Sequence, residues 1–379
     1  MRRFEDLVPA IEVLSDGKNK VLFDDQDAPS IMVVFNKSEF TDIFNEATLN
    51  SVFGPFGAYT TAYMSKFQNI VKNGRAYSLP LQNPATDVAS SGGNTTVSVS
   101  WDYANQVSEA KGTGWVLCPN SLWGAVSHLA RVNNTLPHGN NNYGSDINYP
   151  NESGTGCYWS GTDLRTCKVL TGSGPTTWYS DHTPYGVSDM NGNVTEWVGG
   201  FRHVYGEPQF ITIADMVAHR GYSATSDVWN AVSGSGGPLK ITNPSATSIY
   251  GQNAIRYYIN SSGKMALQVT AADGNTTTAN TARESWTTYM GTGEFVVETG
   301  ATTAKDYILI PFGLFPLNTR TTDVYGGQGL WLSPNHNERI CYRGGDWSSG
   351  SRAGVWYAYM SIARSSTNYN LGFRSAFYE

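Results

Sequence analysis

The feature that most restricts the fold of this 379-residue chain is that only one stretch carries a clear helical pattern. After Cys118-Pro119-Asn120, five apolar residues fall on one face at helical spacing: Leu122, Trp123, Val126, Leu129 and Ala130. We expect Asn120 or Ser121 to cap this helix. Elsewhere, short apolar runs alternate with clusters of Gly, Ser, Thr and Asn. The pattern predicts an α+β protein with few helices, short strands and abundant loop.

Three apolar runs are predicted strands: 30–35, 308–312 and 339–342. Residues 1–45 form a predicted small N-terminal unit, and residues 46–379 a second, larger domain. Within the larger domain, residues 203–330 alternate strand-like runs with polar loops, which is typical of an irregular insertion.

Composition and charge exclude several classes of function. The formal net charge is −6, so the positive footprint of a nucleic-acid binder is missing. We expect no membrane insertion, because no run is long and apolar enough to span a bilayer. The start, MRRFEDLVPAIEVLSDG, has no continuous apolar core, so we expect no signal peptide. Only 15% of residues are charged while Tyr and Trp are plentiful, which favours an ordered, loop-rich protein over a disordered one.

The motifs of common enzymes are missing from the sequence. The four cysteines, Cys118, Cys157, Cys167 and Cys341, form no C-x-x-C pair. Cys157 and Cys167 either close a small loop or stay reduced like the others. The histidines form no H-E-x-x-H motif, and His182 fits a structural Asp-His-Thr turn better than a catalytic base. There is no G-x-S-x-G motif and no P-loop. We expect no catalytic residues.

The stretch DMNGNVTEW, residues 189–197, is the densest short motif. It is open to two interpretations. Asn-Gly favours the tight turn of a hairpin, in which Val194 and Trp197 pack. Alternatively, Asp189, Glu196 and the carbonyls between them are the hard oxygen ligands that calcium prefers. The residues alone leave both interpretations open.

The C-terminal segment, residues 343–374, has the composition of a binding surface. Tyr and Trp give large contact area for little rotamer entropy, Ser and Gly give adaptable hydrogen bonding, and Arg serves as an anchor. The alternative is an aromatic-rich sheet core, to which some of these rings belong. We favour the binding surface and predict these contact residues: Asp346, Ser348, Ser349, Ser351, Arg352, Trp356, Tyr357, Tyr359, Ser361, Ile362, Ser366, Asn368 and Tyr369.

Three segments together resemble the formylglycine-generating-enzyme-like domains. PYGVSDMNGNVTEWV, residues 184–198, is similar to the G-L-x-D-M-x-G-N-V-W-E-W block of that family. RGGDW (343–347), AR (363–364) and LGFR (371–374) resemble its C-terminal block. The resemblance covers the chain from roughly residue 60, with residues 203–330 outside it. It implies a C-type-lectin fold of the formylglycine-generating-enzyme-like subtype.

Departures from the family pattern indicate which branch the chain resembles. The oxidases of the family hold copper with a cysteine pair shortly after R-G-G-x-W, and residues 348–363 contain no cysteine. The sulfoxide-forming members carry an iron-binding helical domain, for which this chain has neither the length nor the histidines. The remaining branch is the variable proteins of diversity-generating retroelements, which include phage tropism determinants. The stretches 65–80 and 171–178 are also similar to phage and prophage members of this branch.

In that branch a C-terminal repeat ending in G-F-R is rewritten at adenines, mostly in asparagine codons. Ser, Arg, Tyr and Ile, which stand at such positions here, are all reachable from an AAC codon. Lys, Glu and Gln are not reachable, and none occurs between Asp346 and Asn370. The resemblance implies that Trp347, Val355, Ala363 and Phe373 are scaffold residues between the variable positions.

The calcium-binding relatives contact the metal at positions that match Asp189, Gly192, Val194 and Glu196. The middle two ligate through backbone carbonyls, and all four residues are compatible with a structural Ca²⁺ ion. Thr195 replaces the family's usual Trp.

The first functional hypothesis is a non-enzymatic receptor- or ligand-binding protein with a diversified, hypervariable site on its C-terminal segment. The expected setting is a phage tail or a prophage adhesin, placed on the virion or outside the cell. Its partner would be a protein or glycan receptor on a target cell surface. The alternatives are a divergent formylglycine-generating oxidase acting on a peptide cysteine, and a structural virion protein with a fixed surface.

Overall fold

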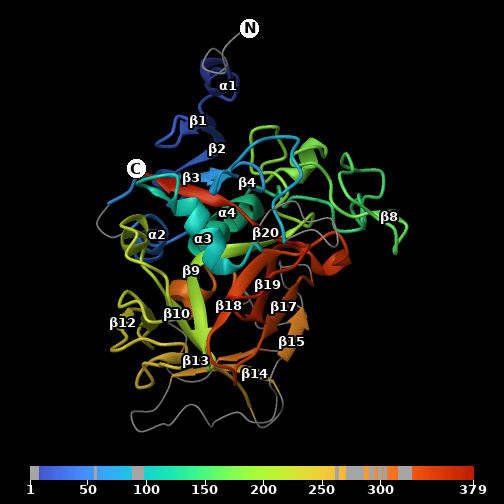
Figure 1. The fold of residues 1–379 in the computed structure, drawn as a ribbon. Coiled ribbons are helices and arrows are strands. Elements are labelled where there is room, and N and C mark those ends of the chain that lie inside the picture. The colour runs from blue at the N-terminus through green and yellow to red at the C-terminus, as the bar shows by residue number, and fades with distance from the viewer. Residues whose placement is uncertain are drawn as a thin grey trace.

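The computed structural model of the chain describes residues 8–54, 58–87, 98–260, 264–269, 286–289, 295–297, 301, 305–314 and 327–379. It is a mixed α+β protein with few helices and many antiparallel strand pairs (Figure 1). The helices in this part of the chain are α1 (Val8–Leu14), α2 (Glu46–Phe53), α3 (Trp101–Glu109), α4 (Asn120–Val132) and α5 (Ile213–Val217). None of the described helices is long and apolar enough to cross a membrane.

A five-stranded sheet contains both the first strands of the chain and its last strand. Its strand order is β1 (Asn19–Phe23), β2 (Pro29–Asn36), β3 (Thr61–Ser65), β21 (Ser375–Tyr378) and β6 (Trp115–Leu117). The strand predicted at 30–35 is confirmed as β2. Strand β2 pairs with β3, so this sheet continues across the boundary that the sequence suggested at residue 45.

A nine-stranded sheet carries most of the C-terminal segment. Its order is β12 (Pro238–Lys240), β11 (Asn230–Val232), β10 (Glu207–Phe210), β9 (Thr195–Val204), β18 (Arg339–Gly344), β19 (Gly354–Ile362), β17 (Gly329–Leu332) and β15 (Trp286–Tyr289), with β20 (Leu371–Phe373) pairing with β9. The strand predicted at 339–342 is confirmed as β18. Strands from residues 203–330 extend this sheet on both sides.

Smaller elements complete the fold. They are a sheet of β13 (Ile255–Ile259), β14 (Met265–Val269) and β16 (Phe295–Val297), the hairpins β4 (Ile70–Lys72) with β5 (Arg75–Tyr77) and β7 (Trp159–Ser160) with β8 (Arg165–Thr166), and the short helices η2 (Lys37–Phe40), η4 (Thr176–Trp178), η5 (Lys305–Leu309) and η6 (Gly350–Arg352).

The predicted helix is confirmed as α4, but its predicted cap is wrong. Pro119 is the N-cap, with φ −63° and ψ 143°, and the helix has no side-chain cap hydrogen bond. Proline fixes its own φ and so sets the extended residue from which the helix starts. Asn120 therefore lies already inside the helix, where its amide does not cap the first turn.

The strand predicted at 308–312 is also wrong. Residues up to Leu309 belong to η5, a single π-helical stretch, and the Phe312 amide donates to the Ile308 carbonyl over 3.0 Å. Ile308, Leu309 and Phe312 are all buried. A short apolar run does not distinguish a strand from a buried helical turn, which is why periodicity failed here.

Helix α4 joins the core to the C-terminal sheet. It packs against both β9 and β19. The Trp123 indole nitrogen donates to the Val355 carbonyl over 2.8 Å, and both residues are buried. The core thus supports β19 from one face and leaves its other face for side chains that point away from α4.

Candidate functional site

Strand β19 divides its side chains between the core and a more open face. Successive residues of a strand point to opposite sides. Trp356, Ala358 and Met360 are fully buried in the core. Tyr359 and Ser361 on the other side are only half-buried. The strand therefore has one structural face and one face that belongs to the candidate site.

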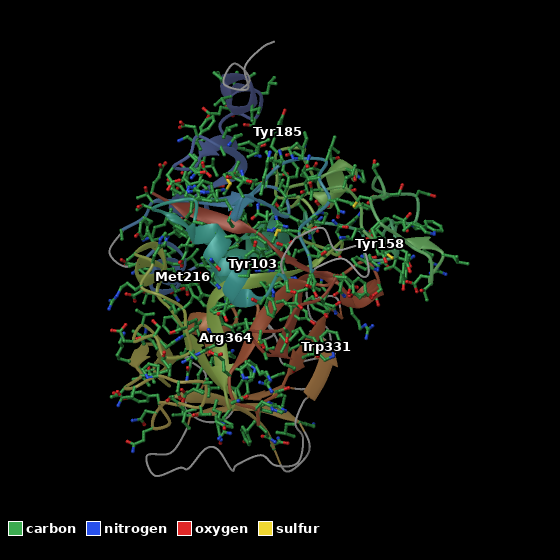
Figure 2. All side chains as sticks on the ribbon, in the orientation of Figure 1. Tyr103, Tyr158, Tyr185, Met216, Trp331 and Arg364 are labelled. Atoms are coloured by element: carbon green, nitrogen blue, oxygen red, sulfur yellow. The ribbon has the colours of Figure 1, made fainter. Side chains whose placement is uncertain are left out.

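Aromatic rings from three strands gather on this second face. Tyr342 and Tyr359 stack with ring centroids 4.8 Å apart, and Trp331 lies 5.6 Å from Tyr359 and 5.0 Å from Tyr357. The Arg352 guanidinium lies over the Trp331 ring at 5.8 Å. We call Trp331, Tyr342, Tyr357, Tyr359 and Arg352 the aromatic array; Figure 2 labels Trp331 on the β17 side of the sheet.

Tyr342 and Tyr357 of the array are neutral hydrogen-bonding groups. Burial raises the pKa of both the Tyr342 and the Tyr357 hydroxyls well above the ordinary value of 10. Arg352 is exposed and charged. Aromatic rings with polar tips and one cation suit contact with a protein or glycan surface.

The loop between β18 and β19 is organised around Asp346. One oxygen of its carboxylate accepts hydrogen bonds from the Ser348 backbone amide and hydroxyl, both at 2.8 Å, and from the Ser349 hydroxyl at 3.0 Å. The other accepts from the Asn370 amide, which ties the loop to the segment before β20. Asp346 is only 8% exposed. It therefore positions the loop, in which Ser348 and Ser351 are both exposed.

The segment between β19 and β20 is held in a similar way. The Arg364 guanidinium forms two hydrogen bonds of 2.6 Å with the Glu338 carboxylate and one of 3.0 Å with Asp102. The Tyr369 ring lies 5.6 Å from that of Trp347 but stays 40% exposed. Asn368 beside it is exposed too. The two loops thus display side chains from a well-connected backbone.

A polar hollow of about 420 Å³ opens beside Ser351. Among its walls are amides, a carboxylate and the stacked rings of His138 and Tyr149, whose centroids lie 3.7 Å apart. Amide and carboxylate groups beside an aromatic ring provide hydrogen bonds and an apolar platform for a polar ligand. The hollow adjoins the C-terminal segment and enlarges the surface that a partner can contact.

The thirteen predicted contact residues divide into three groups by exposure. Ser348, Ser351, Arg352, Asn368 and Tyr369 are exposed; Ser349, Tyr359, Ser361, Ile362 and Ser366 are half-buried; Asp346, Trp356 and Tyr357 are buried.

Trp356 must be corrected from a contact residue to a core residue. It is 0% exposed, and its ring lies edge-on to His128 at 4.7 Å. The alternation of β19 explains this, because Trp356 points to the face opposite Tyr357. Tyr357, only 7% exposed, supports the other rings of the array more than it presents a surface of its own.

Two residues of the array were missed by the sequence analysis. Trp331 and Tyr342 lie outside the segment with the Ser- and Tyr-rich composition, and nothing in their local sequence marks them. The β17–β19 pairing aligns Trp331 with Tyr359, and the β18–β19 pairing aligns Tyr342 with the same residue. Only the strand order reveals this arrangement.

The expected frame of the segment is buried. Trp347, Val355 and Phe373 are each at most 3% exposed, while Ala363 is half-buried. Gly345 has φ +75°, and a Cβ there would lie 2.8 Å from the Cβ of Ala353. A side chain at Gly345 would therefore both strain the backbone and collide with the far end of the same loop.

The four residues of the expected calcium site do come together, but around a side-chain amide. The Gln68 amide nitrogen lies 3.2, 3.4 and 3.0 Å from the carbonyl oxygens of Asp189, Gly192 and Val194, and 3.0 Å from a Glu196 carboxylate oxygen. Calcium–oxygen distances are 2.3–2.6 Å, so these oxygens are spaced for a hydrogen-bond donor. The loop is not a hairpin turn, since β9 pairs with β10, β18 and β20.

Charge compensation at this site also comes from the protein. Arg374 holds both oxygens of Glu196 in a fully buried ion pair, with distances of 2.5 and 2.6 Å. One oxygen of the Asp189 carboxylate accepts from the Gly172 amide and the Ser188 hydroxyl, at 2.8 and 2.9 Å, and the other is buried with no hydrogen-bond partner among the described residues. Across the described ranges no group of three or more His, Cys, Asp and Glu side chains is placed to hold a metal. As arranged, the residues do not fit a Ca²⁺ ion.

The cysteines remain separate thiols in this structure. Cys157 and Cys167, which the sequence left open as a crosslink, are both free, as are Cys118 and Cys341. Burial raises the pKa of the Cys341 thiol to about 11, so it is protonated at neutral pH. The His182 Nε2 donates to the Leu136 carbonyl oxygen over 3.1 Å.

Comparison with known proteins adds no family. No protein-family model matches the chain, and no curated protein matches its sequence.

Proposed function

We propose that this chain is a non-enzymatic receptor- or ligand-binding protein with a C-type-lectin fold of the formylglycine-generating-enzyme-like subtype. Its binding surface consists of the aromatic array and the exposed residues of the two C-terminal loops. The partner is a protein or glycan receptor on a target cell, and the setting is a phage tail or prophage adhesin. The segment is the diversified, variable part of the protein.

The observation that carries the proposal is the division of residues 343–374 into an anchored frame and an outward-facing surface. Arg343 donates to the Gly313 and Val355 carbonyls over 3.0 and 3.2 Å from a fully buried position. Ser348, Ser351 and Arg352 project from the loop between these anchors. A rigid scaffold under adaptable loops lets surface side chains change without unfolding the domain.

Contacts among the family-like motifs support the fold subtype. Motifs that are far apart in the sequence meet at one place: Glu196 pairs with Arg374, and the Gly192 amide donates to the Gly344 carbonyl over 3.1 Å. Chance matches to three separate motifs would have no reason to adjoin. Their adjacency favours a shared architecture with the resembled family.

The proposal is tested by binding of the labelled protein to a panel of intact bacterial cells. One variant replaces the exposed side chains of the loops with alanine: Ser348, Ser351, Arg352, Asn368 and Tyr369. We expect it to lose cell binding while its melting temperature stays close to that of the unmodified protein. The matched control carries Gln26→Ala and Asp27→Ala, which are exposed in the β1–β2 turn, well away from β19 (Figure 1).

Two outcomes of this experiment decide against the proposal. If the loop variant binds every cell type as well as the unmodified protein, the receptor site lies elsewhere. If no cell in the panel is bound but the protein takes up stoichiometric copper that Cys341→Ser abolishes, the oxidase alternative replaces it. The buried, protonated Cys341 thiol favours the non-enzymatic function, because a metal binds the thiolate.

A further inference from the structure

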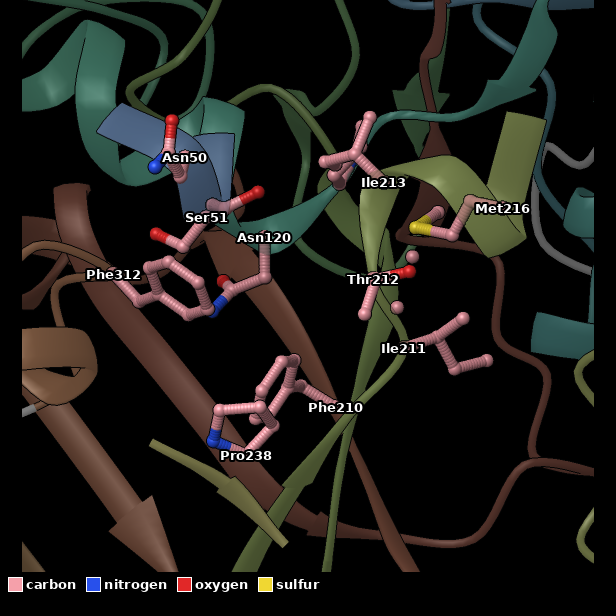
Figure 3. A pocket seen from close by; sticks show the side chains of 14 residues that line it. Asn50, Ser51, Asn120, Phe210, Ile211, Thr212, Ile213, Met216, Pro238 and Phe312 are labelled. Carbon is pink, nitrogen blue, oxygen red and sulfur yellow. The ribbon is translucent and has the colours of Figure 1, made fainter. Parts of the chain in front are cut away.

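A second pocket lies at the start of α4, away from the aromatic array. It encloses about 200 Å³ between α2, α4 and the β10–α5 turn (Figure 3). Phe210, Ile211, Ile213 and Met216 on one side and Phe312 on the other form a buried apolar wall. In Figure 2, Met216 is well separated from Trp331, so this pocket is distinct from the candidate receptor surface.

The mouth of the pocket is more exposed than its walls. Asn50, Ser51 and Thr212 are half-buried there, and Pro238 is exposed. A cavity of about 150 Å³ with apolar walls holds a benzene molecule in another protein. The space here is therefore enough for one ring and a small substituent.

Asn120 supplies an unusual polar group inside this apolar pocket. Its side chain is only 1% exposed, and neither its amide oxygen nor its amide nitrogen has a hydrogen-bond partner among the described residues. Figure 3 shows the amide beside Ser51 and Phe312. Leaving a buried donor and acceptor unpaired opposes folding, so a partner in the pocket would relieve this cost.

The backbone around Asn120 explains why its amide faces the pocket. Pro119 takes the N-cap position, so the Asn120 side chain does not cap the helix. The first backbone amides of a helix have no partner within the helix, and Asn120 and Ser121 of this turn line the pocket. The Asn120 side chain thus brings an unpaired donor and an unpaired acceptor to an apolar wall.

The lining of the pocket favours a neutral ligand. Among the described residues, no Lys, Arg, Asp or Glu lines it. Charges of both signs lie outside the mouth. Glu46 and Asp306 line a neighbouring hollow, Lys305 pairs with Asp306 over 2.8 Å, and Lys37 donates to the Asn50 amide oxygen over 3.1 Å. A charged ligand would therefore lose its hydration and find no opposite charge inside.

We propose that this pocket binds a small neutral ligand that carries a carboxamide, or a similar group with a donor next to an acceptor, on an apolar body of about one ring. The ligand's carbonyl accepts from the Asn120 amide nitrogen, and its N–H donates to the Asn120 amide oxygen. The apolar body lies against Phe210, Met216 and Phe312. This site does not depend on the proposed receptor function.

The test uses benzamide as the probe, with ethylbenzene and benzoate as comparators of similar size. Binding to the full-length protein is measured by ligand-observed NMR and by isothermal titration. We expect benzamide to bind about tenfold more tightly than ethylbenzene. The reason is that pairing its amide with Asn120 contributes roughly the net free energy of one hydrogen bond after desolvation. Benzoate is expected to bind most weakly.

Asn120→Leu provides the matched variant, with Asn133→Leu at the exposed C-terminal end of the same helix as the control. Asn120→Leu should abolish the preference for benzamide over ethylbenzene and raise the melting temperature. Asn133→Leu should leave the preference intact. Failure of benzamide to bind the folded, unmodified protein overturns the proposal, as does equal binding by Asn120→Leu. The wild-type preference among the three probes decides the question even if that variant does not fold.

Discussion

The rings of Tyr342 and Tyr359 stack 4.8 Å apart and within 5° of parallel across the β18–β19 pair. The strand register sets this contact, because Tyr342 lies opposite Tyr359 in the ladder. Tyr342 also meets the core, with its ring edge-on to the fully buried Trp197 at 5.7 Å. Tyr359 of the candidate binding surface therefore packs on Tyr342, and Tyr342 in turn packs on the core residue Trp197.

Single alanine substitutions should separate the surface rings from the supporting one. Tyr357→Ala should lower the free energy of unfolding by about 3 kcal/mol, since it deletes a ring that is only 7% exposed. Tyr369→Ala, at 40% exposed, should change it by no more than about 0.5 kcal/mol. Urea unfolding measures both. Equal effects from the two substitutions would contradict the burial found here.

The frame and the surface should also differ in their tolerance of new side chains. Gly345→Ala is expected to cost about 2 kcal/mol, because it forces a Cβ into left-handed backbone and onto Ala353. Ser348→Asn and Ser351→Asn should each stay within about 0.5 kcal/mol of the unmodified protein. Thermal melting of the three variants gives the comparison. A neutral Gly345→Ala would show that the loop is not held as described.

Gln68→Leu tests whether an amide takes the place expected for calcium. Without the Gln68 amide, three buried carbonyl oxygens and one carboxylate oxygen lose a hydrogen-bond donor. We therefore expect the free energy of unfolding to fall by about 3 kcal/mol. Gln82→Leu serves as the control. The Gln82 side-chain amide donates an exposed hydrogen bond to the Pro80 carbonyl, so its loss should have little effect on stability. Calcium or a chelator should leave the melting temperature of the unmodified protein unchanged. A rise on adding calcium would restore the expected metal site.

The Glu338 ion pairs make a prediction about pH. Burial alone raises the pKa of the Glu338 carboxyl, but the hydrogen bonds and charges of Arg364 and Arg202 outweigh it and hold the pKa below the ordinary 4.5. A carboxyl with a lowered folded-state pKa contributes stability above its unfolded pKa and loses it as pH falls through the folded value. Glu338→Gln should therefore cost about 3 kcal/mol at pH 7.

That cost should shrink as the pH falls below 4.5, the ordinary carboxyl value, because the unmodified protein then becomes protonated at Glu338 as well. Urea unfolding of both proteins at several pH values measures the difference. A difference that stays constant down to strongly acidic pH would contradict the ion-pair interpretation.

Patterns within short stretches of the sequence predicted individual helices and strands correctly where the apolar pattern fits only one type of element. The apolar face of 120–132 and the β-branched run at 30–35 each form the expected element, α4 and β2. The run at 308–312 failed because a few apolar residues are equally compatible with a buried turn. The cap of α4 failed because proline fixed the position of the first helical residue.

The site was less accessible to sequence reasoning because strand order determines it. Composition located the exposed Ser, Arg and Tyr positions, yet it also included Trp356, whose ring points into the core. Trp331 and Tyr342 come from neighbouring strands and carry no local signal. Gln68 completes the 189–196 loop from more than a hundred residues away, and only the tertiary fold reveals this contact.

We propose that residues 343–374 combine a fixed frame with a surface that varies. Sequencing the 3′ end of this gene across many isolates tests it most directly. Substitutions should concentrate at the exposed and half-buried contact positions, such as Ser348, Ser351 and Tyr369, and arise at adenines of a near-identical repeat. Arg343, Gly345 and Arg374 should stay constant. Substitutions spread evenly over frame and surface would contradict the claim.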